Sequence, residues 1–139
     1  MTDAEKTPRA IDLWILDLAL TAVSFLLAYR ARVLFSVPGR QILPFEAYAP
    51  SLAVIAPTWA IVLPLFGVYS KQPSLRRLGA AVAAAWLAAI AAEFVLMKTE
   101  VFIYWTSSRV MQLFTLVINF CLLASYRLLL LRKESGRWL

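Results

Sequence analysis

The residues best placed for chemistry are two charged side chains inside apolar segments. Asp17 lies about two turns into an apolar run that begins at Ile11, and Arg127 lies within a run that ends at Leu131. Burying a charge in hydrocarbon is costly, so such residues mark a functional or structural site. We expect Asp17 and Arg127 to pair. The pair could fix helix register, or it could form a polar pocket for the phosphate head of a lipid, to which arginine gives paired hydrogen bonds.

A second set of charged residues lies at the opposite ends of the apolar runs. Glu93 lies near the end of the third run, Arg30 at the end of the first and Arg109 at the start of the fourth. We expect Glu93 to pair with Arg109 or Arg30 near the membrane surface. A proton relay would need a chain of acids or histidines, and the sequence has no histidine.

The lack of histidine also bears on catalysis, because histidine is the commonest general base and a common metal ligand. The sequence has no glycine-rich phosphate loop and no acidic cluster that would hold Mg²⁺. Cys121 is alone in an apolar run and indicates nothing about redox compartment. We therefore expect no catalytic residue, metal or cofactor in this chain, and leave open whether a parent protein is an enzyme.

Composition places these residues in a membrane. Of 139 residues, 62% are hydrophobic and 16% charged, whereas soluble proteins have about 45–50% and about 25%. Four apolar runs each approach the roughly 20 residues that cross a bilayer as a helix. The sequence predicts an all-α, four-helix transmembrane bundle. We expect helices at about 11–32, 50–68, 78–97 and 109–131, after an N-terminal tail (1–10) and before a basic tail or linker (132–139).

The basic residues predict orientation and partners. With the N-terminus inside, nine of the 14 Lys and Arg residues lie on the cytoplasmic side and five outside, which favours cytoplasmic termini. The net charge is +6, but these residues lie at run ends rather than on one face. They are suited to lipid phosphates, and we expect no nucleic-acid partner.

Two helices carry features of helix packing. Pro57 and Pro64 interrupt the second run and predict kinks, which could serve as a hinge or cavity wall, or only bend a helix that its neighbours accommodate. The third run has small residues at four-residue steps, which allow close helix approach. This row could pack inside the bundle or form a dimer face. Its members are Ala80, Ala84, Ala88 and Ala92.

Several short stretches carry a family resemblance. They are Ile15–Leu18 and Leu27–Arg32, Leu65–Tyr69 and Ser74–Leu78, Ser108–Val110, and Tyr126–Arg132. Together they resemble the N-terminal four-helix membrane region of the large bacterial polyprenyl-phosphate hexose-1-phosphate transferases, which initiate capsule and exopolysaccharide synthesis. The membrane-bound nucleotide-sugar 4,6-dehydratases have a similar region and are the second choice.

The resemblance implies a scaffold at the bacterial cytoplasmic (inner) membrane. In both families the catalytic domains follow the fourth helix, so no catalytic residue carries over, and this sequence is either a fragment or a relative without the catalytic part. The matching motif positions are Asp17, the turn of Phe66, Gly67 and Tyr69, and Arg109 and Arg127.

We therefore expect a non-catalytic region that supports folding, oligomerisation and placement. Its expected partners are membrane lipids, with polyprenyl phosphate a candidate among them, and a second copy or a glycan-synthesis enzyme. The alternative is a small transporter or polyprenyl-lipid-binding carrier with a polar site near Asp17 and Arg127. A carrier needs a polar cavity, whereas a scaffold has these two residues directly paired.

Overall fold

The computed structural model describes residues 10–35, 41–69, 74–96 and 108–135, and these are all-α as predicted. The elements in this part of the chain are α1 (Ala10–Leu34), a 3-10 helix η1 (Phe45–Ala47), α2 (Ala49–Leu65), α3 (Leu75–Leu96) and α4 (Arg109–Ser135). By length and composition, α1, α3 and the Arg109–Leu131 part of α4 can each cross a membrane. The fourth expected span, α2, is apolar but has only 17 residues.

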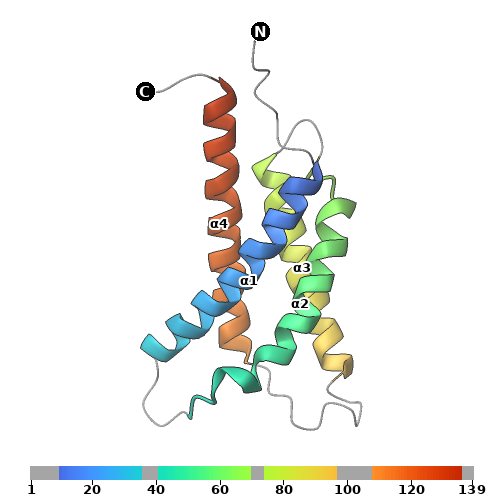
Figure 1. Ribbon diagram of the computed structural model, residues 1–139. Helices are drawn as coiled ribbons and strands as arrows, with labels where there is room; N and C mark the ends of the chain where they lie inside the picture. Colours follow the sequence, from blue (N-terminus) through green and yellow to red (C-terminus); the bar gives the residue numbers. More distant parts are fainter. Residues whose placement is uncertain (1–9, 36–40, 70–73, 97–107, 136–139) are drawn as a thin grey trace.

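The four helices alternate in direction (Figure 1). The start of α1, the end of α2, the start of α3 and the end of α4 lie together, uppermost in Figure 1, and we call this the α2–α3 end. The α1 helix crosses α4 obliquely and packs against it more extensively than against α2, while α2 packs on α3. Asp17 and Arg127 therefore lie on the two helices that share the largest interface in the bundle.

A turn of defined geometry ends α2 at Leu65, earlier than the predicted residue 68. Gly67 adopts φ of 63°, a left-handed conformation that glycine adopts without a Cβ penalty. The Gly67 amide donates to the Pro64 carbonyl at 2.9 Å and the Val68 amide to the Leu63 carbonyl at 3.4 Å. These two bonds are those of a Schellman motif. The buried Leu63 and Val68 side chains supply its usual apolar residues.

The other helix boundaries also differ slightly from the sequence prediction. The third helix begins at Leu75 rather than 78, and the Ser74 carbonyl accepts a hydrogen bond from the Leu78 amide at 3.0 Å. The fourth helix continues to Ser135, into the segment predicted to be a tail. Residues 1–9 of the expected N-terminal tail and 136–139 of the basic tail lie outside the described residues.

Both prolines lie inside α2 with exposed side chains. The helix continues across Pro57 and ends one residue after Pro64. The ring of each proline therefore lies on the outside of the bundle, away from the buried contacts of α2. Whether either proline acts as a hinge stays a prediction.

A different alanine row from the predicted one faces the interior of the bundle. Ala81, Ala85 and Ala89 are buried at 0–3% exposure. Of the predicted row, Ala80 and Ala88 are exposed, and Ala84 and Ala92 are half-buried. The buried row is offset by one residue from the predicted row, so packing of α3 inside the bundle uses the neighbours of the predicted residues. A dimer face at the predicted row stays a prediction.

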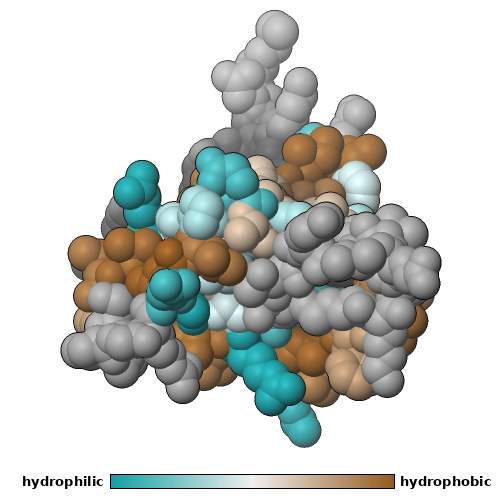
Figure 2. Space-filling model, turned by 90° about the horizontal axis from the view of Figure 1, so that it is seen from below, coloured by the Kyte–Doolittle hydropathy of each residue, from teal (hydrophilic) through white to brown (hydrophobic). Residues whose placement is uncertain are grey.

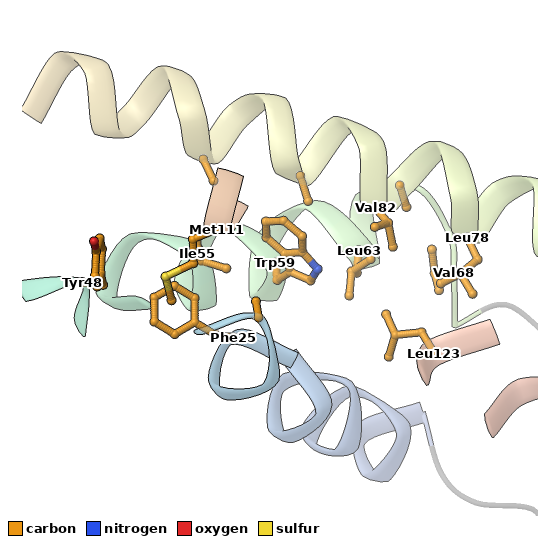
Figure 3. Close-up of a cluster of buried hydrophobic side chains, with 14 residues drawn as sticks. Phe25, Tyr48, Ile55, Trp59, Leu63, Val68, Leu78, Val82, Met111 and Leu123 are labelled. Atoms are coloured by element: carbon orange, nitrogen blue, oxygen red, sulfur yellow. The ribbon is translucent and has the colours of Figure 1, made fainter. Parts of the chain in front are cut away.

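The apolar core is centred on Trp59 of α2, which is fully buried. Figure 3 shows its indole between α3 and α1, with Ile55 and Leu63 from the same helix on either side. Many large apolar side chains remain exposed, among them Leu65, Leu87 and Val95. In the view from below, hydrophobic residues form large areas on opposite flanks of the molecule (Figure 2). Such a surface suits a hydrocarbon solvent.

Candidate functional site

The structure brings Asp17 and Arg127 together in an ion pair. Arg127 Nη2 lies 2.7 Å from Asp17 Oδ2. The Asp17 side chain is 0% exposed and that of Arg127 is 7% exposed. The contact joins the second turn of α1 to the last third of α4 near the α2–α3 end. Burying either charge alone would be strongly unfavourable. The buried pair therefore depends on the close placement of the two charges and of their hydrogen-bond partners.

The turn after α2 supplies two further partners of this pair. The Tyr69 hydroxyl donates to Asp17 Oδ2 at 2.9 Å, and Arg127 Nη1 donates to the Val68 carbonyl at 2.8 Å. The Arg127 guanidinium also lies 5.4 Å from the centre of the Tyr69 ring, a cation–π distance. The left-handed Gly67 directs the chain so that both groups face the pair. We call Asp17, Val68, Tyr69 and Arg127 the ion-pair cluster.

Tyr69 acts in this cluster as a neutral donor. Burial, and then the negative charge of Asp17, raise the pKa of the Tyr69 hydroxyl above its ordinary value. The hydroxyl therefore keeps its proton and donates a hydrogen bond to the Asp17 carboxylate. Two atoms of the cluster, Asp17 Oδ1 and Arg127 Nε, are buried without a hydrogen-bond partner among the described residues.

A second buried polar group surrounds Asn119, in the middle of α4. Its Nδ2 donates to Thr21 Oγ1 at 2.8 Å and to Ser24 Oγ at 3.2 Å, both on α1. Its Oδ1 accepts from Trp59 Nε1 at 3.4 Å, on α2. Asn119 thereby links three helices through one amide, and all four side chains are fully buried.

A third polar contact lies toward the other end of the bundle. Gln112 Nε2 of α4 donates to Glu93 Oε2 of α3, and both residues are buried. Both Arg109 and Arg30 are exposed, and the pairing of Glu93 with either of them stays a prediction.

The buried polar residues of α1 and α4 recur along one face of each helix. On α1 the buried polar residues are Asp17, Thr21 and Ser24, spaced by four and three residues as one helix face requires. On α4 they are Gln112, Thr115, Asn119 and Arg127. We call these seven residues the polar seam. Through Asn119 and Arg127 the seam joins α4 to α1, and through Gln112 it joins α4 to α3.

Sequence reasoning identified the charged members of the seam and missed most of the neutral ones. Thr21 and Ser24 follow Asp17 at positions i+4 and i+7, and this spacing is the signal that could have found them. The role of Tyr69 as a donor to Asp17 was also missed. Trp59 gave no local signal, because its partner Asn119 is 60 residues away.

The side-chain contacts described above join helices to one another. In the described residues no group of three or more His, Cys, Asp or Glu side chains could hold a metal ion. In the ion-pair cluster the Asp17 carboxylate is engaged by Tyr69 and Arg127, and the two opposite charges balance. A separate groove between α3 and α4 is lined by apolar side chains. Comparisons with protein-family models, curated protein sequences and solved structures find no match to this chain.

Proposed function

We propose that this chain is a non-catalytic membrane scaffold of the kind that the four-helix region of polyprenyl-phosphate sugar-1-phosphate transferases provides. One observation carries the proposal. Asp17, the turn through Tyr69 and Arg127 come from three of the sequence stretches that suggest the resemblance, and they meet in one buried contact. Residues that are scattered over 111 positions of sequence thus have a common structural task, which is to hold α1, α2 and α4 in register.

The placement in the membrane is part of the proposal. The distribution of Lys and Arg, nine against five, supports cytoplasmic termini in a bacterial inner membrane. The α2 helix would be the fourth span. Its 17 residues cover about 25 Å at 1.5 Å per residue, and the apolar turn of Phe66, Gly67 and Val68 extends this length. Reporter fusions after residues 38, 72 and 103 test this orientation.

The packing of the ion-pair cluster favours a scaffold over a carrier. A carrier that binds a lipid phosphate needs the Arg127 guanidinium available to its ligand. Here Nη1 and Nη2 are taken by Val68 and Asp17. The groove between α3 and α4 is apolar and none of its lining residues belongs to the seam. The buried polar groups are therefore used for contacts between helices.

A chimera tests the scaffold proposal. Residues 10–135 would replace the four-helix region of a sugar-1-phosphate transferase, and an unrelated four-span protein with cytoplasmic termini would replace it in the control chimera. We expect only the first chimera to restore the oligomeric size and sugar-phosphate transfer of the parent enzyme. Equal performance of two well-inserted chimeras would contradict a specific scaffold role.

A second experiment tests the carrier alternative directly. Purified chain in proteoliposomes would be assayed for saturable binding and transbilayer movement of a labelled polyprenyl phosphate. We expect neither activity. Saturable binding that is lost in Asp17→Asn, while Asp12→Asn retains it, would favour the carrier and overturn the proposed role.

A further inference from the structure

An open apolar groove lies on the flank of the bundle between α3 and α4. Its volume is about 330 Å³. Gly79, Val82 and Ala83 line it from α3, and Leu116, Val117, Phe120 and Cys121 line it from α4. Almost all of its lining is apolar, and it faces the side of the bundle where lipid chains would lie.

Small residues on α3 create this groove. Gly79 has no side chain, and an added Cβ there would lie 3.5 Å from the Phe120 ring, an ordinary contact distance. Ala83, one turn further on, is exposed and fills little of the space beside α4. The groove is therefore a shallow channel along the helix pair, with Phe120 as one wall.

An exposed arginine lies on the same face of α3 as this channel. Arg76 is exposed in the first turn of α3. Arg76, Gly79 and Ala83 are spaced as i, i+3 and i+7, so they share one face of the helix. The N-terminus of α3 adds the positive end of its helix dipole. This face of α3 thus has positive charge at the α2–α3 end and apolar surface further along the helix.

We propose that this groove binds one acyl chain of an anionic phospholipid whose phosphate group contacts Arg76. The charge at one end and the apolar lining beyond it match the two parts of such a lipid. A second copy docked on this face in a symmetric parallel pair would bring the two Arg76 side chains toward one another, since both copies use the same face.

Native mass spectrometry tests the headgroup and the charge. The chain would be released from nanodiscs that contain equal amounts of phosphatidylglycerol and phosphatidylcholine with identical acyl chains. We expect one retained lipid per chain, with phosphatidylglycerol preferred about five-fold, the effect that one basic residue near an anionic surface produces. Arg76→Gln should abolish this preference, whereas Arg30→Gln, at an exposed arginine on the other end of the bundle, should keep it.

Filling the groove tests the place of the acyl chain. Ala83→Leu should lower the retained lipid several-fold. The control Ala88→Leu adds the same side chain at an exposed position of α3 outside the groove, and it should leave lipid retention unchanged. Both variants would be compared at equal helix content by circular dichroism.

Three results would overturn the proposal. The first is equal lipid loss in Ala83→Leu and Ala88→Leu, which would mean that the lipid lies elsewhere. The second is a phosphatidylglycerol preference that survives Arg76→Gln. The third is a lipid-free dimer that Ala83→Leu dissociates, which would assign the groove to a second copy.

Discussion

Removing both charges of the Asp17–Arg127 pair should destabilise the bundle by far less than the sum of the two single removals. Asp17→Leu leaves the buried guanidinium without its counter-charge and the Tyr69 hydroxyl without its acceptor. Arg127→Met leaves the Asp17 carboxylate, which is 0% exposed, with one remaining donor. The double variant Asp17→Leu/Arg127→Met removes both charges and keeps the apolar volume.

The burial of both charged side chains determines how much unfolding free energy each variant should lose. Breaking a buried ion pair by removing one partner costs about 3–5 kcal/mol, whereas replacing both partners with apolar residues is often neutral or stabilising. Each single variant should therefore lose about 3 kcal/mol or more of unfolding free energy. The double variant still leaves the Tyr69 hydroxyl and the Val68 carbonyl without partners, and each costs about 1–3 kcal/mol if water does not reach it.

The assay is reversible unfolding in mixed detergent micelles, followed by circular dichroism and tryptophan fluorescence. The double-mutant cycle should give a coupling energy of about 3 kcal/mol between the two sites. Asp12→Asn is the matched control, because Asp12 is exposed on the same helix, and it should change stability by less than about 1 kcal/mol. Additive losses in the double variant would refute the argument that the two charges stabilise one another.

Three further variants test neighbouring features in the same unfolding assay. Asn119→Leu should cost about 1–2 kcal/mol, because it removes hydrogen bonds that join three helices; no loss would mean that the amide is not needed for packing. Gly67→Ala should cost about 1 kcal/mol through its left-handed conformation, while Gly79→Ala, which has room for a Cβ, should not; equal effects would reject the conformational explanation. Ala81→Leu should cost about 1–3 kcal/mol by overpacking, and the exposed Ala80→Leu should cost much less; the reverse order would place the predicted row inside the bundle.

Helix type and approximate length could be predicted from composition, because each apolar run must satisfy its own backbone hydrogen bonds in lipid. The ends of the helices depend on local geometry that hydropathy does not report. The second helix stops at Leu65 because Gly67 turns left-handed, although the apolar sequence continues through Val68. Its end could have been found from the glycine signal rather than from hydropathy.

The charged part of the site could be predicted because isolated charges stand out in an apolar run. Depth along antiparallel helices was enough to match Asp17 with Arg127. Glu93 shows the limit of this argument, since depth along the helices gives no signal for its neutral partner Gln112. Neutral polar residues are common in membrane helices, so their partners depend on helix rotation, which a single sequence with weak periodicity does not specify.

The location of the polar seam explains how the first and last helices of the chain are held together. In lipid, apolar side chains gain little by leaving one hydrocarbon surface for another, so helix association depends on close packing and polar contacts. Small residues such as Ala81, Ala85 and Ala89 supply close packing at α3. At the α1–α4 interface, Asp17, Asn119 and Arg127 supply specific polar contacts. Because the turn at Gly67 also contacts this seam, the register of α1 against α4 is coupled to the end of α2.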